Sequence, residues 1–498
     1  MKYLLDSSSM KEADRHTIED KNVPSLDLME NAASAAAEEI ILRYSGKGRI
    51  LVVCGSGNNG GDGLAVSRLL KKQHYRVEAA FVGSPEKATA ETKAQLNKCR
   101  EAGVDIYDTI RRNTYDVVVD AVFGIGLCRN IEGKYADIIR KMNDIRALKF
   151  AVDISSGISA DTGNVLGIAF KADYTVTFAY GKIGQFRNPG AEYCGKVIIR
   201  DIGIRGTKEA EASYVRTFRR KDIERLLPER KRDSNKGTFG KALVIAGSKN
   251  MAGAAFLTAL AAYRTGAGLV RIYTPEANRV ILQTLLPEAI VTTYDGVCTD
   301  DDSLSSSIEW ADFIAAGPGM GTSDESQAII CRLLQQSSCP LVIDADGLNI
   351  LSLHPDWLET RNSKYVIVTP HPGEMARLTK LTVPDIKNSF LKTADEFARH
   401  FRAACVLKDA NTYVASPDRS GYLNLSGSSS MAKAGSGDVL TGIILGLLCS
   451  GMEPYDAAEL GVYIHGLCGE EAASSYGEYS VLGRELADAA GIVLRKYT

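Results

Sequence analysis

The sequence predicts an α/β protein of two domains, each built on a parallel sheet with helices on its faces. Short apolar runs typical of buried strands alternate with longer alanine- and leucine-rich segments typical of helices, and this alternation favours parallel pairing. A charged break at residues 216–233 separates two such series. A chain of 498 residues with 45% hydrophobic residues can fill two cores of this kind.

The N-terminal series begins with a helical segment that includes residues 26–31 and continues, rich in alanine, to Ile41. Strand-like runs follow at residues 49–54, 117–122 and 150–154. Several of these runs end in Gly, Asp or Ser, where a parallel strand passes into a helix. Since open α/β sheets bind ligands outside the carboxyl ends of their strands, we expect a site at this edge.

Three strand-end segments of this series carry polar side chains. Residues 55–63 read Gly-Ser-Gly-Asn-Asn-Gly-Gly-Asp-Gly before a helix predicted at 64–70, so backbone N–H groups and a helix start can hold a diphosphate. Two other strands end in Asp120-Ala-Val-Phe-Gly and Val152-Asp-Ile-Ser-Ser-Gly. Each segment could be only a structural cap. At one sheet edge, their oxygens together suit a monovalent or alkaline-earth cation.

Residues 216–233 break the pattern with a run of basic and acidic residues. The run is either a patch for nucleic acid or a solvated linker with one helical turn. We favour the linker because acidic residues are interleaved and Phe218 is the only aromatic residue in the run. One domain is therefore predicted at residues 1–215 and the other at 225–498.

The C-terminal series predicts a second parallel sheet, with a long helix at 252–265. Its strands are expected at 241–246, 268–273, 313–316, 340–343, 365–369 and 405–408.

A glycine-rich turn near the C-terminus precedes the apolar stretch 439–449. Gly435 and Gly437 allow the backbone to direct several N–H groups at one point, and the start of a helix adds partial positive charge, which suits a phosphoryl group. Asp438 stands beside this anion site. It is either a helix cap or the base that takes the proton of a hydroxyl attacking a γ-phosphate.

Two other positions have alternative interpretations. His371 lies between two prolines after the strand expected at 365–369, and we favour ligand contact over the filling of a tight turn. Asp344 and Asp346 could form a metal or phosphate-ordering site or could cap the local backbone, and the sequence favours neither.

Composition limits the partners and the compartment. A formal net charge of −2 gives no overall attraction to nucleic acid or acidic membranes, so neither is expected as a partner. Ten scattered cysteines without a C-x-x-C pair favour reduced, mostly buried thiols. The N-terminus becomes polar too early for a signal peptide, and the stretch 439–449 is too short to span a bilayer. We expect a cytoplasmic homo-oligomer.

These motifs resemble those of a known enzyme family. The three strand-end segments resemble the NAD(P)HX epimerase domain, the YjeF N-terminal-like family, with a Rossmann-like fold. The C-terminal series resembles the ADP-dependent NAD(P)HX dehydratase, with a ribokinase-like fold. Its markers are Lys236-Gly-Thr-Phe-Gly-Lys, Ala246-Gly-Ser, Gly253-Ala, Gly317-Pro-Gly-Met-Gly, Asp344-Ala-Asp-Gly-Leu-Asn, Thr369-Pro-His-Pro-Gly-Glu-Met and Gly435-Ser-Gly-Asp. The resemblance covers nearly the whole chain and implies a bifunctional isomerase and lyase that repairs hydrated nicotinamide nucleotides.

For the first domain, the resemblance implies contacts with the hydrated dinucleotide and a potassium ion. The implied substrate contacts are Asn58, Asn59, Gly60, Gly61, Asp62, Gly124, Ile125, Gly126, Leu127, Cys128, Arg129, Asn130 and Asp153. Asn59, Asp120 and Ser156 match the potassium ligands, and Asp153 is taken as the acid/base. Ser155 replaces the proline of the family's V-D-x-P-S-G, which relaxes the φ restraint on this loop.

For the second domain, the resemblance implies that Ala254, Gly319, His371 and Asp438 face the hydrated nucleotide. The implied contacts with ADP or ATP, which bind with Mg²⁺, are Lys408, Asp409, Ala410, Asn411, Thr412 and Gly437. Asp409 stands where the family usually has glycine, and its charge could shift the preference between ADP and ATP.

The implied reaction begins when Asp438 deprotonates the C6 hydroxyl of the S epimer, whose oxygen then attacks the terminal phosphate of ADP or ATP. Phosphate then leaves the ring and the dihydropyridine is restored, while an epimerase on the same chain lets both epimers be repaired. One rival function is a kinase for a vitamin precursor or sugar. The other is a first domain that only binds, as similar domains do in RNA-decapping assemblies, although Asn59, Asp120 and Asp153 are intact.

Overall fold

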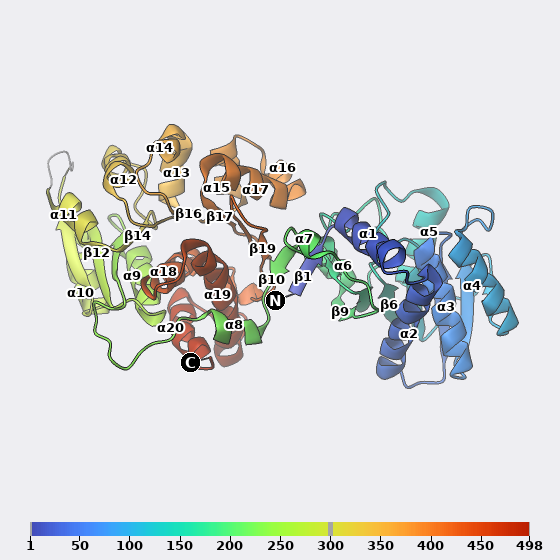
Figure 1. Ribbon diagram of the computed structural model, residues 1–498. Helices are drawn as coiled ribbons and strands as arrows, with labels where there is room; N and C mark the ends of the chain where they lie inside the picture. Colours follow the sequence, from blue (N-terminus) through green and yellow to red (C-terminus); the bar gives the residue numbers. More distant parts are fainter. Residues whose placement is uncertain (1, 297–301, 498) are drawn as a thin grey trace. The chain divides into compact units, whose positions relative to one another are not determined.

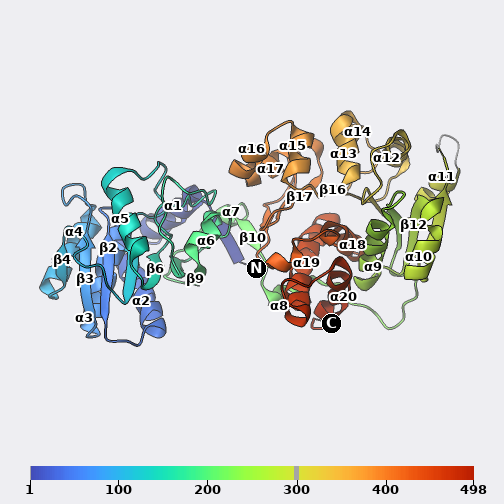
Figure 2. The same ribbon diagram turned by 180° about the vertical axis from the view of Figure 1, so that it is seen from behind.

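The computed structural model describes residues 2–296 and 302–497. Contacts between residues divide the chain into two compact units, Lys2–Val215 and Arg216–Thr498. Each unit is a sheet of mainly parallel strands with helices packed against it (Figures 1 and 2). The predicted α/β fold with two parallel-sheet domains is confirmed.

The main sheet of the N-terminal unit is parallel, in the order β4-β3-β2-β5-β6-β7-β9. Its strands are β2 (Arg49–Cys54), β3 (Arg76–Phe81), β4 (Asp105–Tyr107), β5 (Val117–Ala121), β6 (Leu148–Val152), β7 (Tyr174–Phe178) and β9 (Lys196–Arg200). The three predicted strands are β2, β5 and β6. Strand order reverses between β2 and β5, and doubly wound sheets bind ligands at such a reversal.

Helices cover both faces of this sheet (Figures 1 and 2). Along β2, Ile50 and Val52 belong to a core shared with α1 to α4, whereas Leu51 and Val53 belong to a second core shared with α5. The helices are α1 (Ser7–Arg15), α2 (Ser25–Arg43), α3 (Asn58–Lys72), α4 (Ala90–Glu101), α5 (Gly133–Asp144), α6 (Gly190–Cys194) and α7 (Lys208–Glu211). Two short strands, β1 (Lys2–Leu5) and β8 (Gly181–Lys182), pair in parallel.

The helix after β2 begins earlier than the sequence predicted. Helix α3 starts at Asn58 rather than Leu64, so the segment rich in glycine and asparagine forms its first turns. A side chain would prevent this packing, because a Cβ at Gly60 would lie 1.9 Å from the carbonyl oxygen of Gly55. The first N–H groups of α3 are therefore available at the carboxyl end of β2.

The sheet of the C-terminal unit has the order β13-β12-β11-β14-β15-β16-β17-β18-β19, and β10 pairs in parallel with β19. Strands from β13 to β17 are parallel, and β18 is antiparallel to both neighbours. The bounds are β10 (Val215–Thr217), β11 (Lys241–Ile245), β12 (Leu269–Pro275), β13 (Ile290–Tyr294), β14 (Phe313–Ala316), β15 (Leu341–Ile343), β16 (Val366–Val368), β17 (Ala404–Leu407), β18 (Tyr413–Ala415) and β19 (Tyr422–Leu423). The predicted strands are β11, β12 and β14 to β17, and the order reverses between β11 and β14.

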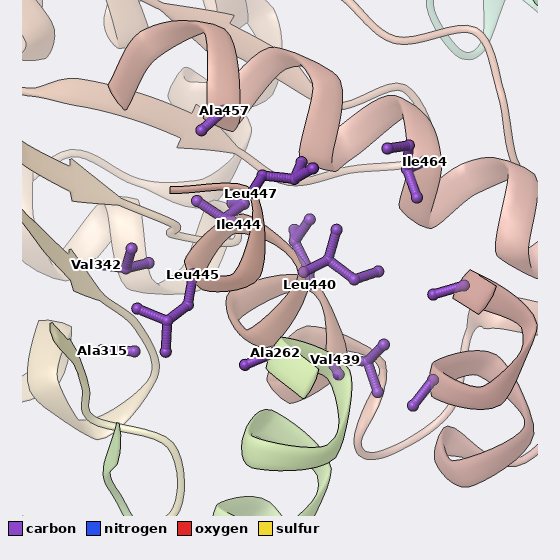
Figure 3. Close-up of a cluster of buried hydrophobic side chains, with 14 of the residues drawn as sticks. Ala262, Ala315, Val342, Val439, Leu440, Ile444, Leu445, Leu447, Ala457 and Ile464 are labelled. Carbon is purple, nitrogen blue, oxygen red and sulfur yellow. The ribbon is translucent and has the colours of Figure 1, made fainter. Parts of the chain in front are cut away.

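Helix α18 (Ser436–Cys449) packs between α9 (Ala252–Arg264) and α19 (Pro454–Tyr476) and is buried from Val439 onward. Figure 3 shows its side chains between Ala262 of α9 and Ile464 of α19, with Leu445 directed toward the sheet. The other helices are α8 (Arg220–Leu226), α10 (Arg279–Leu285), α11 (Asp302–Trp310), α12 (Asp324–Gln336), α13 (Asp346–Leu353), α14 (Asp356–Glu359), α15 (Pro372–Thr379), α16 (Val383–Asn388), α17 (Phe390–Phe401) and α20 (Gly483–Leu494). Within residues 2–296 and 302–497, no helix combines the length and apolarity needed to cross a membrane.

The interpretation of residues 216–233 as a solvated linker is wrong for its first part. Strand β10 and helix α8 both lie in this run, and Phe218 and Ile223 are buried in the core of the C-terminal unit. Arg216 donates a hydrogen bond to Glu459 over 2.6 Å, with both side chains largely buried. The high charge of the run concealed two buried apolar positions, one before helix α8 and one within it.

Candidate active sites

A cavity of about 580 Å³ lies at the carboxyl ends of β2, β5 and β6 in the N-terminal unit. Helices α1 and α2 close its other side. Of the predicted substrate contacts, its walls include Asn58, Asn59, Asp62, Gly124, Ile125, Gly126, Leu127, Cys128, Arg129 and Asp153. Gly60 and Gly61 are buried within α3, and Asn130 is exposed beyond the wall. The three predicted strand-end segments therefore meet at one place.

Asp120 and Ser156 are in direct contact beside this cavity. The Ser156 hydroxyl and backbone N–H both donate to the Asp120 carboxylate over 2.7 Å, and the Val122 N–H donates over 3.1 Å. Burial nevertheless raises the pKa of Asp120 to about 6. Asn59 lies against the backbone of Gly124, and among the described residues its buried amide has no hydrogen-bond partner. An unsatisfied amide oxygen and a buried carboxylate at the carboxyl ends of neighbouring strands suit a hard cation.

Asp153 follows β6 in the left-handed conformation, with φ of 65°. Its carboxylate accepts from Lys182 Nζ over 2.5 Å and from Thr177 Oγ1 over 3.1 Å. Sequence reasoning missed Lys182, which is completely buried. A lysine four residues beyond strand β7 was the available signal. Ser155 is also buried, and its hydroxyl donates to the carbonyl of Tyr193 over 3.0 Å, which fixes the loop without proline.

The second site lies at the start of α18. Gly435 is its N-cap, with φ of 88°, and the N–H groups of Gly437 and Asp438 in the first turn have no preceding helical carbonyl to bond. Burial and the charge of Asp344 raise the pKa of Asp438 to about 6, while Lys408 opposes the shift. The predicted anion site and its carboxylate are therefore adjacent.

An ion pair lies beside the glycine turn that begins α18. Lys408 Nζ lies 2.7 Å from Asp344 Oδ1, and Thr441 Oγ1 donates to Asp344 Oδ2 over 2.8 Å. A Cβ at Gly437 would lie 3.5 Å from Lys408 Nζ, which places the ammonium beside the glycine turn. Asp346 instead accepts from the N–H of Gly321 over 2.9 Å. Asp344 is therefore paired with Lys408 beside the glycine turn, whereas Asp346 holds the backbone of a different loop at Gly321; a metal or phosphate-ordering role stays a prediction.

Ala254 and Gly319 also come together at the reversal between β11 and β14. A Cβ at Gly319 would lie 2.8 Å from the Cβ of Ala254, and the N–H of Gly247 donates to the carbonyl of Pro318 over 2.8 Å. Both predicted contacts follow strands of the same sheet edge as Lys408 and Asp344. The edge is thus formed by small residues on one side and by charged groups on the other.

His371 has the structural role considered for it, and its contact with a ligand stays a prediction. Its Nδ1 accepts from the N–H of Gly373 over 2.9 Å and from that of Glu374, and so caps α15. The ring is half-exposed at the carboxyl end of β16, and burial together with the charge of Lys408 lowers its pKa. A neutral imidazole that is fixed by capping remains available to a ligand.

The predicted nucleotide segment connects β17 with β18. Lys408 reaches into the site, whereas Asp409 and Ala410 are exposed. The Asp409 carboxylate accepts from the N–H of Ala410 over 3.0 Å, and Asn411 Nδ2 donates to the carbonyl of Asn424 over 3.2 Å. Together with Thr412, these residues form an ordered turn at the rim of the site.

Comparison with known proteins relates each half of the chain to a separate family model. Residues 25–184 match the model of the YjeF-related protein N-terminus, and residues 242–490 match the model of NAD(P)H-hydrate dehydratase. The bifunctional NAD(P)H-hydrate repair enzyme Nnr of Thermofilum pendens is 36% identical, over 95% of this chain and 92% of the relative. The enzyme of the same name from Moorella thermoacetica is 36% identical, over 99% and 97%. This chain belongs to the bifunctional NAD(P)H-hydrate repair enzymes.

Solved structures agree with this membership. The ADP/ATP-dependent NAD(P)H-hydrate dehydratase from Bacillus subtilis, co-crystallized with ATP and Mg²⁺, is 33% identical with a TM-score of 0.51, and the match covers 57% of this chain and 99% of that chain. A ribokinase-like superfamily protein from Enterococcus faecalis is 28% identical with a TM-score of 0.51, over 57% and 96%. The predicted family, its ribokinase-like C-terminal fold and its bifunctional enzyme class are confirmed.

Proposed function

We propose that the N-terminal unit interconverts the R and S epimers of hydrated NADH or NADPH, and that the C-terminal unit dehydrates the S epimer with ADP or ATP. The arrangement at the start of α18 carries this proposal: a buried carboxyl, free N–H groups and the Lys408–Asp344 pair meet at one sheet edge. The epimerase is assigned to residues 1–215 and the dehydratase to 225–498, with 216–224 belonging to the second unit.

In the dehydratase, Asp438 accepts the proton of the C6 hydroxyl, and the oxygen attacks the terminal phosphate of the nucleotide. The N–H groups of Gly437 and Asp438 stabilise the charge on the equatorial oxygens, with the Lys408 ammonium beside them. The ring-nitrogen electrons then expel phosphate from C6, and loss of a C5 proton forms the C5–C6 double bond. A carboxyl with a pKa of about 6 is ionised at neutral pH and still accepts a proton readily.

Mg²⁺ enters this site with the nucleotide. Within residues 2–296 and 302–497, no group of three or more His, Cys, Asp or Glu side chains forms a metal site. Mg²⁺ is commonly held by one or two carboxylates, substrate phosphates and water, and this sparse donor set fits that mode. When bound, Mg²⁺ neutralises phosphate charge, while Asp438 and Lys408 perform the functions given above.

Potassium is proposed for the epimerase site, held by Asn59, Asp120 and Ser156. The unsatisfied amide of Asn59 and the buried Asp120 carboxylate support this choice, because a cation would satisfy the first and balance the charge of the second. The ion would supply a fixed positive charge that orders the three loops, while Asp153 faces the substrate in the same cavity.

A homo-oligomer is proposed from the edge of the C-terminal sheet. Val280, Ile281 and Leu285 on α10 and Ile290 on the edge strand β13 are apolar and exposed. Such a patch favours contact with another copy of the chain. Light scattering should show an oligomer in the wild type and a smaller species after Val280→Glu.

The central test mixes the purified chain with both epimers of hydrated NADH and follows the absorbance of reduced nicotinamide. Recovery should need ADP or ATP and should include both epimers, with release of free phosphate. A stable phosphorylated product would instead favour the kinase. A fragment starting at Arg216 should convert the S epimer fully and leave the R epimer to slow spontaneous epimerisation, whereas rapid complete conversion would contradict the assignment of the epimerase to the first unit.

A further inference from the structure

The epimerase cavity contains a carboxyl group outside the predicted site. Asp14 lies on α1, and its side chain lines the same cavity as Asp153. The adjoining residues Met10 and Ala13 are buried in the core, which holds this face of α1 against the sheet. Asn59 lines the cavity too, nine-tenths buried and with an unpartnered amide, so the space is arranged for a polar ligand.

The surroundings of Asp14 differ from those of Asp153. Lys182 forms an ion pair with Asp153, so positive charge already stabilises that carboxylate. Within the described part of the chain, Asp14 has no hydrogen-bond or ion-pair partner. Burial, then the charge of Asp153, raise the pKa of Asp14 to about 6, and Lys182 only partly opposes them.

Other charged groups also face this cavity, and they leave the difference between Asp14 and Asp153 in place. Asp62 on α3 lines the cavity, and burial, Asp153 and Asp14 raise its pKa well above the ordinary value. Lys11 and Arg129 also belong to the wall. The cavity thus combines one carboxylate fixed by a lysine with carboxyl groups that favour the protonated form.

We propose that Asp14 is the general acid of epimerisation and that Asp153 is its partner base, an inference that rests on the proposed epimerase function. In the hydrated ring, C6 carries the hydroxyl and is bonded to N1. Asp14 protonates the hydroxyl, the C6–O bond breaks with release of water, and the N1 lone pair forms a C6=N1 iminium ion.

Water then adds to the opposite face of C6 and gives its extra proton to Asp153, while the C6=N1 electrons return to N1. The proton lost by Asp14 is matched by the one gained by Asp153, and exchange with solvent or the reverse reaction resets the pair. Once Asp14 has given up its proton, its carboxylate lies in the same cavity as the positive charge of this intermediate and favours it.

The test measures conversion of the R epimer to the S epimer by the full chain without nucleotide, so that dehydration is absent. Asp14→Asn should lower kcat by about 10²- to 10⁴-fold with little change in KM. In the wild type, kcat/KM should fall as pH rises through about 6. This decline should be absent in Asp14→Asn and restored in Asp14→Glu.

The matched control is Glu12→Gln, which makes the same change at an exposed position of the same helix. It should epimerise like the wild type. Dehydration of the S epimer with ADP should persist in every variant and reports an intact second unit. An Asp14→Asn enzyme that keeps the wild-type pH decline or its kcat overturns the role of Asp14. A wild type that does not epimerise overturns the proposed function itself.

Discussion

The two sites share one arrangement and differ in how it is used. Each has a lysine paired with an aspartate, Lys182 with Asp153 and Lys408 with Asp344, next to a further aspartate without a lysine partner. Burial raises the pKa of that further group to about 6 in both, at Asp14 and at Asp438. Each site therefore places a lysine-paired carboxylate beside a second carboxyl group that has no lysine partner and a raised pKa.

The backbone around the aspartate without a lysine partner differs between the two sites. Asp438 lies in the first turn of α18, where free N–H groups and the helix dipole favour a negative ligand and the carboxylate form. Asp14 is not in the first turn of its helix, because the helical segment runs from Ser7 past Arg15 to Asp20. The same raised pKa thus suits a base in one site and an acid in the other.

The largest expected effect comes from removing the proton acceptor of the second site. Asp438→Asn keeps the shape of the side chain but should lower dehydration by about 10²- to 10⁴-fold, because the C6 hydroxyl is no longer deprotonated. Nucleotide binding, measured by calorimetry, and epimerisation should remain. Dehydration near the wild-type rate would show that Asp438 is not the base of the second site.

Breaking the ion pair of the first site should affect stability as well as activity. Lys182→Met leaves Asp153 largely buried without its cation and should lower the free energy of unfolding of the N-terminal unit by about 3 kcal/mol. Denaturant titration measures this, with exposed Lys171→Met as the control. Equal stability of the two variants would mean that the pair is not needed to hold Asp153.

The raised pKa of Asp438 makes a prediction about stability and pH. Its pKa in the folded protein, about 6, is above the ordinary 3.8, so the folded protein binds this proton more tightly than the unfolded chain does. The proton therefore adds its full contribution to the free energy of unfolding below pH 3.8, and this contribution is lost as pH rises through about 6. Asp438→Asn does not titrate. Relative to the wild type, the variant should therefore gain about 2 to 3 kcal/mol between about pH 4 and about pH 8. A constant difference across this range would contradict the raised pKa.

Potassium should have the smallest effect, and only in the first unit. At ten times its Kd, the ion should stabilise the wild type by roughly 1.4 kcal/mol. Asp120→Ala should raise the concentrations of both potassium and substrate needed for epimerisation. Thermal melting in potassium and in a bulky organic cation measures the first effect. A variant with unchanged potassium dependence would remove Asp120 from the cation site.

The local sequence was sufficient to predict the strand-end segments and the glycine turn. The strands at 49–54 and 313–316 end where predicted, because apolar runs of this length are buried in parallel sheets. The early start of α3 was missed because glycine and asparagine usually end helices, and here packing against Gly55 overrides that preference. Phe218 and Ile223 were missed because charged residues surround them in the sequence.

The sequence by itself determined the family, the parallel-sheet architecture and the place of Asp153 and Asp438 at sheet edges, because neighbouring residues form these features. Only the tertiary structure showed which charges meet. Lys182 lies 29 residues from Asp153 and Lys408 lies 64 residues from Asp344, and Asp14 reaches the cavity from a different helix. Such distances in sequence carry no periodic signal, and burial, which sets the pKa of each group, exists only once the chain has folded.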